Sequence, residues 1–279
     1  MVSQQKQFKK MPDFRVTADH LGREVKHPVR PQRIVSLVPS ITELIWDLGL
    51  QDEIVGITRF CVNPREMFKS KERVGGTKEI KMERLHRLKP DLIVANKEEN
   101  TKEMVTELEK DYPVFVTEVS DFKSALKMID DVADVCGKKE GGQRMSCELN
   151  KQYRAFLEEQ KRPEKRPKVA YMIWKKPWMT VGGDTFVSEM LEIAGMENIF
   201  KKRDRYPMVT LEEIQSVSPD FVLLSSEPYP FKEKHLDEVG SAVADAKIEL
   251  VDGELFSWYG SRLLRSFDYF RNLKKRLTF

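Results

Sequence analysis

The sequence has too few cysteines and histidines for the common metal and disulfide frameworks. Its three cysteines, Cys61, Cys136 and Cys147, form no C-x-x-C pair, and an odd number leaves one of them unpaired. The four histidines include no pair spaced four residues apart, the spacing that puts two ligands on one helical face. We therefore expect no disulfide framework, no zinc site and no bound metal held by protein side chains alone.

Long apolar runs are also missing. No stretch approaches the roughly 20 consecutive apolar residues that a membrane-spanning helix needs. The opening residues, MVSQQKQFKKMPDFRV, contain none of the apolar core that marks a signal peptide. The chain as written is predicted to be soluble, and the lack of a visible leader leaves a cytoplasmic location open.

Neither charge nor motifs point to nucleic acid or to catalysis. The 48 basic and 45 acidic residues nearly cancel, at a net charge of +3, whereas nucleic-acid binding usually needs a clustered basic face. No phosphate-loop pattern G-x-x-x-x-G-K-[ST], dinucleotide pattern G-x-G-x-x-G or nucleophile pattern G-x-S-x-G occurs. Gly75-Gly76 and Gly182-Gly183 are better explained as turn glycines. No paired carboxylates stand out as an acid-base dyad, so we expect a protein that is not an enzyme.

The most informative feature that is present is an internal repeat. Residues 82–94 read MERLHRLKPDLIV, and residues 211–223 read LEEIQSVSPDFVL. Both have an acid after the first apolar residue, apolar residues at helical spacing, then Pro-Asp and an apolar run. Each half of the chain runs strand, helix, Gly, helix, Pro-Asp, strand, and alternating strands and helices indicate parallel sheets with crossover helices. The repeat therefore predicts two related α/β lobes, with ligand bound in a cleft between them.

A charged segment over residues 138–161 separates the two halves. Its apolar residues recur at roughly helical spacing, and a helix of this length spans on the order of 30 Å. Pro residues at Arg162-Pro163 and Arg166-Pro167 then mark a boundary. The predicted fold is α/β, with two Rossmann-like lobes with parallel sheets joined by one long backbone helix. The predicted domains are an N-terminal lobe over 1–118, a helical connector over 119–165 and a C-terminal lobe over 166–279.

Several of these segments resemble one known family. The opening Arg33–Leu44 reads RIVSLVPSITEL, Asp19–Arg23 gives a D-x-x-G-R entry before it, and Leu88–Ile93 gives the L-x-P-D-L-I strand entry. These segments resemble the substrate-binding proteins of class III ABC importers, also called helical-backbone metal receptors. Gly56–Pro64 is similar to the G-x-T-x-x-C-x-x-P stretch of the cobalamin-binding branch. The resemblance covers the chain from about Phe14 to its end.

The resemblance implies a function in transport. In this family one surface glutamate on each lobe docks on the membrane subunits of the importer, and Glu83 and Glu212 match those positions. Both also lie in the first turn of a predicted helix, where a carboxylate stabilises the helix dipole by about 0.3–1 kcal/mol without any partner. Thr210 with Glu213, and Ser40 with Glu43, would form capping boxes. The two explanations for the glutamates are compatible.

The expected ligand contacts lie in loops that follow predicted strands, the edge at which open α/β sheets bind ligands. Aromatic rings outside any core periodicity suit a flat corrinoid or porphyrin, and Tyr and Trp tips can hydrogen-bond its rim. Loop aromatics Trp174 and Trp178 flank Lys175 and Lys176. The predicted ligand-binding residues are Pro39, Ser40, Phe60, Trp178, Tyr229, Trp258, Tyr259 and Arg262.

The predicted function is capture of cobalamin or a related metal chelate and its delivery to an ABC importer, by a monomer without an intrinsic cofactor. Haem is an alternative, for which Tyr229 or Tyr259 would serve as axial ligand. A carboxylate siderophore is another, for which Arg59, Lys175, Lys176 and Arg262 are available. A cytosolic enzyme or sensor on the same scaffold is a third. The family implies a periplasmic or membrane-associated location.

Overall fold

The computed structural model describes residues 13–160 and 166–278. The predicted boundary at Arg162-Pro163 lies outside the described residues. The chain forms two compact units. Unit 1 comprises the residues up to Glu118 together with Asp130–Gly142, and unit 2 comprises Val119–Ile129 and the residues from Gln143 onward. The division into three parts, with a separate connector, stays a prediction.

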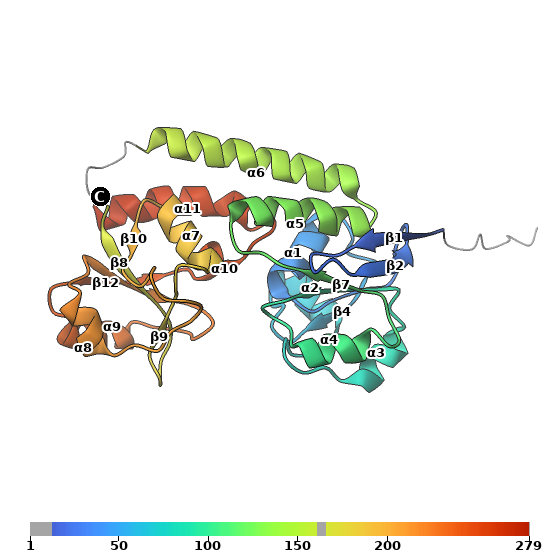
Figure 1. Ribbon diagram of the computed structural model, residues 1–279, viewed down its shortest axis with the longest axis horizontal. Coiled ribbons are helices and arrows are strands. Elements are labelled where there is room, and N and C mark those ends of the chain that lie inside the picture. The colour runs from blue at the N-terminus through green and yellow to red at the C-terminus, as the bar shows by residue number, and fades with distance from the viewer. Residues whose placement is uncertain (1–12, 161–165, 279) are drawn as a thin grey trace, which may run out of the picture. The chain divides into compact units, whose positions relative to one another are not determined.

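Unit 1 is built on a parallel sheet whose described strands follow the order β5-β4-β3-β6-β7. Helices α3 and α4 lie on one side of this sheet and α1 on the other (Figure 1). The elements are β3 (Ile34–Ser36), α1 (Pro39–Asp47), β4 (Ile54–Thr58), α2 (Arg65–Ser70), β5 (Glu72–Gly75), α3 (Met82–Leu88), β6 (Leu92–Asn96), α4 (Lys102–Leu108) and β7 (Val114–Thr117).

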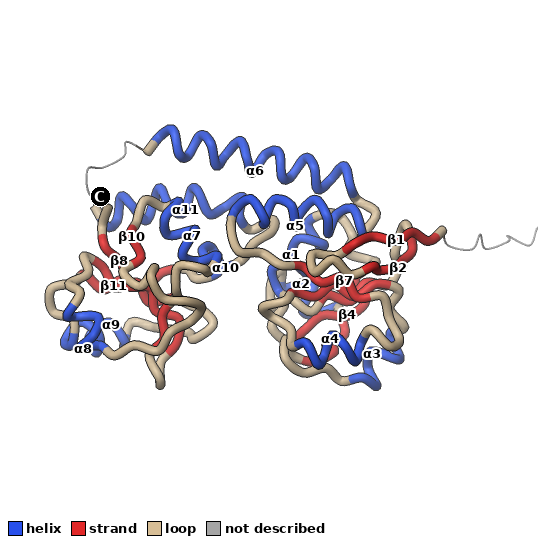
Figure 2. The backbone as a smooth tube through the Cα atoms, viewed as in Figure 1, coloured by secondary structure: helices blue, strands red, loops and turns tan. Residues whose placement is uncertain are grey.

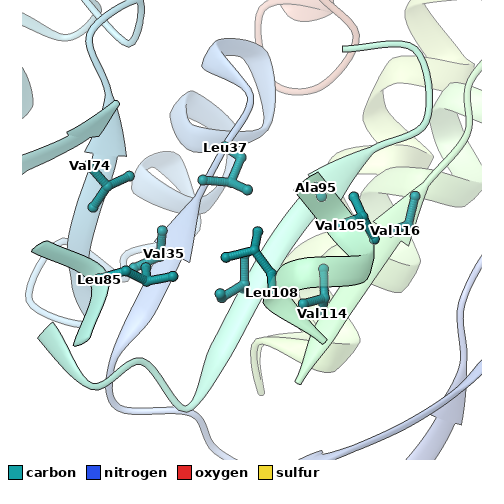
Figure 3. Close-up of a cluster of buried hydrophobic side chains, with 10 residues drawn as sticks. Val35, Leu37, Val74, Leu85, Ala95, Val105, Leu108, Val114 and Val116 are labelled. Carbon is teal, nitrogen blue, oxygen red and sulfur yellow. The ribbon is translucent and has the colours of Figure 1, made fainter. Parts of the chain in front are cut away.

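The core of unit 1 is formed by side chains that point to the same face of the sheet. Alternate residues of β3, β6 and β7 point to one face and pack against α3 and α4, because successive side chains of a strand point to opposite faces. Figure 3 shows this cluster of fully or nearly buried apolar side chains. Its buried members are Val35, Leu37, Val74, Leu85, Ile93, Ala95, Val105, Leu108, Val114 and Val116.

An antiparallel hairpin precedes this sheet. It consists of β1 (Phe14–Ala18) and β2 (Glu24–Pro28), drawn as two adjacent strands in Figure 2. The buried Asp19 carboxylate accepts the backbone N–H groups of Leu21 at 2.9 Å and Arg23 at 3.0 Å, and the Arg23 guanidinium at 2.9 Å. Gly22 has a φ of +76°, which favours glycine. The D-x-x-G-R motif is thus the turn of this hairpin.

Unit 2 contains a second, mostly parallel sheet, in the order β10-β8-β11-β12, with the short β9 antiparallel to β8. Its elements are β8 (Lys168–Trp174), β9 (Met179–Thr180), α7 (Phe186–Ile193), β10 (Glu197–Asn198), α8 (Leu211–Ser216), β11 (Phe221–Ser225), α9 (Lys234–Ala242), β12 (Lys247–Val251), α10 (Glu254–Ser257) and α11 (Leu263–Leu277).

Helices cover both faces of the second sheet as well. On one face, Met172 and Leu224 pack with Ile214 of α8 and Val239 of α9. On the other, the buried ring of Tyr171 lies 5.3 Å from that of Phe256 in α10. Each unit is therefore a three-layer α/β/α structure. The predicted fold class is confirmed.

Two long helices, α5 (Phe122–Val135) and α6 (Lys139–Glu159), each run from one unit into the other along the chain. Over 21 residues, α6 is about 32 Å long at 1.5 Å per residue. Within unit 2 its Phe156 ring lies 5.4 Å from that of Phe267 in α11. Arg271 of α11 donates to both carboxylate oxygens of Glu159, at 2.6 and 2.9 Å. The long helix predicted over residues 138–161 is thus present.

Some local predictions are wrong. Residues 58–76, which the sequence pattern does not mark as helix or strand, contain α2 and β5, each with one fully buried apolar side chain, Met67 and Val74. Such short elements lack enough repeats to show periodicity. Ser40 is not an N-cap: α1 is capped at Val38, and Pro39 occupies its first turn, where a missing N–H costs nothing. The Thr210 cap is present, because its hydroxyl oxygen accepts the Glu213 N–H at 3.1 Å.

The repeated Pro-Asp pair has a structural explanation. Asp91 accepts the backbone N–H groups of Gln32 and Arg33, each at 2.8 Å, at the start of β3. Asp220 accepts the N–H of Lys168 at 2.7 Å, at the start of β8. In each unit the aspartate that begins one strand thus holds the first residues of the neighbouring strand. Both pairs of strands, β3 with β6 and β8 with β11, are parallel neighbours.

We predict that Asp91→Ala lowers the free energy of unfolding by about 1–3 kcal/mol, because two hydrogen bonds to a charged acceptor are lost. The change is measured as a lower urea midpoint. Asp111→Ala, at an exposed position in the same unit, is the control and should change stability by less than about 0.5 kcal/mol. Equal midpoints for the two variants would contradict the assigned role of Asp91.

Candidate ligand-binding site

Both sheets have a point at which the direction of strand addition reverses. In unit 1 the chain proceeds from β3 to β4 and β5 on one side, then returns to β6 and β7 on the other. In unit 2 the same reversal lies between β8 and β11. Open α/β sheets bind ligands outside the carboxyl ends of the strands at such a switch point. The loops after β3, β6, β8 and β11 are therefore the candidate site of each unit.

Pro39 and Ser40 directly follow β3 and form the first turn of α1. Ser40 is buried and Pro39 half-buried. Phe60, in the loop after the adjacent strand β4, is 47% exposed, and the Arg59 guanidinium lies 4.9 Å from its ring centroid. Of the residues predicted in unit 1, Phe60 offers the largest apolar surface to a ligand.

A cluster of buried polar side chains connects these two loops through hydrogen bonds. The Thr42 hydroxyl lies 2.7 Å from Ser36 Oγ, 2.7 Å from the Val38 carbonyl oxygen and 3.2 Å from Cys61 Sγ. Cys61 Sγ is also 3.1 Å from the Thr58 hydroxyl. Burial raises the pKa of the Cys61 thiol, so the thiol stays protonated and acts as a structural group. The cluster joins the loop after β3 to the loop after β4.

The loop after β6 was not identified from the sequence. Asn96, the last residue of β6, accepts the N–H groups of Glu98 at 2.9 Å and Glu99 at 3.2 Å through its side-chain oxygen. Asn100 donates to the Thr77 carbonyl at 2.8 Å and to the Leu37 carbonyl at 3.4 Å. Only their position in the chain could have identified these residues, because they follow β6, which lies next to β3 at the switch point.

Aromatic side chains surround the switch point of unit 2. Trp174 ends β8 and is 40% exposed, and its ring meets that of Tyr229 edge-on at 5.7 Å. Tyr229 packs on Phe231 at 4.7 Å, and Trp178 lies parallel to Phe231 at 6.0 Å. The Tyr229 N–H donates to the Ile173 carbonyl at 3.2 Å, which joins the loop after β11 to β8. Trp178 and Tyr229, both predicted from the sequence, thus belong to one aromatic cluster.

His235 completes this cluster and was missed by the sequence analysis. Its buried ring lies 5.4 Å from Phe231, and its Nε2 is 3.4 Å from the Tyr229 hydroxyl. Its Nδ1 is 2.9 Å from the backbone nitrogen of Lys232. Lys175 lies 5.5 Å from the Trp178 ring centroid and forms an ion pair with Glu238. That ion pair lowers the pKa of Glu238.

Trp258, Tyr259 and Arg262 lie before α11 and are mostly buried. Trp258 is 7% and Tyr259 6% exposed. The Arg262 guanidinium lies 4.5 Å from the Trp258 ring centroid and forms an ion pair with Glu254. Tyr259 meets Phe186 of α7 edge-on at 5.7 Å. These three side chains therefore contact their own unit extensively, and their role in ligand binding stays a prediction.

Glu83 and Glu212 are exposed in the first turns of α3 and α8. Neighbouring charges are paired: Arg84 lies 3.6 Å from Glu72, and Glu213 forms an ion pair with Arg203. No ion pair joins Glu83 or Glu212 to another described residue. A backbone N–H bond and the Thr210 hydroxyl lower the pKa of Glu212, so this carboxylate is ionised at neutral pH.

Over residues 13–160 and 166–278, no group of three or more His, Cys, Asp or Glu side chains is arranged to hold a metal ion. Within the same ranges, every helix is too short or too polar to pass through a lipid bilayer.

The profile of the periplasmic binding protein family matches residues 34–246. The chain belongs to this family. The family comprises substrate-binding proteins and not enzymes, and the resemblance to the class III proteins of ABC importers is confirmed. This periplasmic binding protein is thus the substrate-binding component of an ABC importer.

Three known proteins illustrate the relationship. A vitamin B12-binding protein of Vibrio campbellii is 31% identical over 196 residues, which cover 70% of each chain. An uncharacterized ABC transporter substrate-binding lipoprotein of Bacillus subtilis is 28% identical, covering 90% of this chain and 82% of its own. The structure of a haem-binding protein from Roseiflexus sp. RS-1 has a TM-score of 0.74 at 21% identity, covering 88% of this chain and 97% of its own, and shows a shared fold.

We predict that Thr42→Val loosens the loops after β3 and β4, because Ser36 and Cys61 lose a buried hydrogen-bonding partner. The free energy of unfolding should fall by about 1–3 kcal/mol. Ellman's reagent should label Cys61 faster than in the unchanged protein, while the exposed Cys147 reacts equally in both. Thr106→Val, on the exposed side of α4, is the control. Unchanged protection of Cys61 would contradict the role of Thr42.

Proposed function

We propose that this protein binds cobalamin or a related corrinoid and delivers it to the membrane subunits of its importer. The single observation that carries this proposal is the identity of 31% to a vitamin B12-binding protein over 70% of both chains. The aromatic cluster supports it. A corrinoid is a flat, largely apolar ring, and the exposed parts of Trp174 and Phe60 are flat apolar surfaces at strand ends.

The polar surroundings of these rings also suit a corrinoid. Its rim carries amide groups, which both donate and accept hydrogen bonds. β11 ends at Ser225, the loop after it begins with Ser226 and Glu227, and Ser226 Oγ accepts the Gly253 N–H at 2.9 Å. β6 ends at Asn96, and the loop after it carries Glu98 and Glu99. Such loops offer uncharged and acidic acceptors to amide donors.

Haem is the second candidate, favoured by one contact. The Tyr229 hydroxyl lies 3.4 Å from His235 Nε2, and both groups are known ligands of haem iron. His235 is buried and its other ring nitrogen contacts the backbone at Lys232, so Tyr229 is the group nearer to solvent. The carboxylate siderophore is less supported, because Lys175 and Arg262 already form ion pairs with Glu238 and Glu254.

We also propose that Glu83 and Glu212 dock on basic groups of the importer. Their carboxylates are exposed and have no ion-pair partner among the described residues, while adjacent charges are compensated. A carboxylate presented in this way is available for a charge pair across an interface. The family and the lipoprotein relative support an extracytoplasmic location, and a cytosolic sensor is the alternative that cell fractionation distinguishes. The monomeric state stays a prediction.

We predict that the purified protein retains cyanocobalamin in native mass spectrometry and shifts its visible spectrum. Trp174→Ala should weaken this binding about tenfold or more, the usual cost of removing an aromatic anchor. Phe14→Ala removes a more exposed ring on β1, away from the candidate site, and should have no effect. Absence of a complex at excess ligand would refute the corrinoid proposal. Haemin binding that Tyr229→Phe abolishes would favour the haem alternative.

We predict that the Glu83→Ala, Glu212→Ala double variant still binds ligand but loses uptake through the importer. Each charge pair removed should cost about 2–5 kcal/mol of docking free energy if it is buried on docking. The measurement is uptake of radiolabelled ligand by cells that carry the cognate importer. Glu103→Ala together with Glu107→Ala, both exposed on α4, is the control. Normal uptake by the double variant would eliminate the docking role.

A further inference from the structure

Glu99 is not among the ligand-binding residues predicted from the sequence. It lies in the loop after β6, at the switch point of the unit 1 sheet, beside the loop that carries Pro39 and Ser40. The two loops are joined, because Asn100 Nδ2 donates to the carbonyl of Leu37, the residue after β3. Glu99 is therefore held at the edge of the sheet where a ligand of this unit is expected.

The backbone that carries Glu99 is held from both sides. Asn96, which is buried, accepts the N–H of Glu99 at 3.2 Å and donates to Thr117 Oγ1 on β7 at 3.1 Å. Asn100 accepts the N–H of Asn96 at 2.9 Å and donates to the Thr77 carbonyl at 2.8 Å. The five residues from Asn96 to Asn100 thus form a closed turn attached to neighbouring strands and loops. A side chain on such a turn is pre-organised, so little conformational entropy is lost when it binds.

The Glu99 carboxylate itself makes no hydrogen bond or ion pair with another described residue. The side chain is half-buried, and burial raises the pKa of its carboxyl group. Lys78 opposes this shift from a distance, but its ammonium group donates to the Glu98 carbonyl at 2.8 Å instead of pairing with Glu99. Removing a carboxylate from water without a partner destabilises the folded protein. A residue kept in this state at a binding edge is a candidate for function.

We infer that Glu99 is a specificity-determining residue of the ligand site, which accepts hydrogen bonds from the amide rim of a corrinoid and disfavours ligands fringed by carboxylates. This inference rests on the proposed function. An amide N–H bound to a carboxylate is a charge-assisted hydrogen bond, roughly twice as strong as a neutral one. A ligand carboxylate at the same place would face a like charge, which provides discrimination by repulsion.

The inference is tested with two probes, cyanocobalamin and haemin, whose rims carry amides and carboxylates respectively. Dissociation constants are measured by visible absorption for the full chain and for Glu99→Ala and Glu99→Gln. Glu99→Ala should weaken cyanocobalamin binding about tenfold, the loss expected for a hydrogen bond to a charged group. Glu99→Gln removes the charge at nearly constant shape and should tighten haemin binding about threefold or more. Glu103→Gln, exposed on α4, is the matched control and should change neither constant.

Stability gives an independent readout. Because the Glu99 carboxylate is partly desolvated and unpaired, Glu99→Gln should hold or raise the urea midpoint. A lower midpoint would mean that the carboxylate stabilises the fold through Lys78, and it would overturn the inference.

The binding outcomes separate this inference from the proposed function. If the unchanged protein binds cyanocobalamin and Glu99→Ala binds it within twofold, the inference fails and the proposed function stands. If the unchanged protein binds only haemin, the corrinoid proposal fails, and the inference survives only if Glu99→Gln binds haemin more tightly. A protein that binds neither probe overturns both.

Discussion

An aspartate side chain at the start of one central strand holds the start of its neighbour, and the rest of each unit depends on this contact. Asp91 accepts two backbone N–H groups before β3, and Asp220 accepts one at the start of β8. A parallel strand pair has no tight turn to set its register, because its connection passes through a helix. The aspartate supplies a local constraint in place of a turn. It brings the two strands level at their amino ends, where Ile34 pairs with Leu92 and Val169 pairs with Phe221.

The two units use this shared framework differently. In unit 1 the loops at the switch point are held by buried polar groups, with the Thr42 and Cys61 cluster under one loop and the Asn96 and Asn100 hydrogen bonds under another. In unit 2 the corresponding loops are held mainly by ring contacts among Trp174, Tyr229 and Phe231. A turn held by side-chain amide hydrogen bonds and an aromatic cluster provide different contacts, the first directional and the second based on apolar area.

Pairing of charges distinguishes side chains that are committed to the fold from those that are available to a ligand or partner. Arg262 is stacked on Trp258 and paired with Glu254, and Lys175 is paired with Glu238. Glu83, Glu99 and Glu212 have no such partner among the described residues. An uncompensated charge is costly when it is buried and nearly free when it is exposed. Exposure at Glu83 and Glu212 therefore suits transient docking, whereas partial burial at Glu99 suits recognition of a ligand.

The sequence by itself determined the repeated α/β organisation and the long helix between the two halves. Periodicity encodes which face of an element is buried, and Pro, Gly and capping residues encode where it ends. Only the tertiary structure decided that Trp258 and Arg262 pack within unit 2 and that α2, β5 and β10 exist. It alone brought Asn100 to Leu37 and left the Glu99 carboxylate without an ion-pair partner among the described residues. These outcomes depend on contacts between residues far apart in the chain, which local pattern does not record.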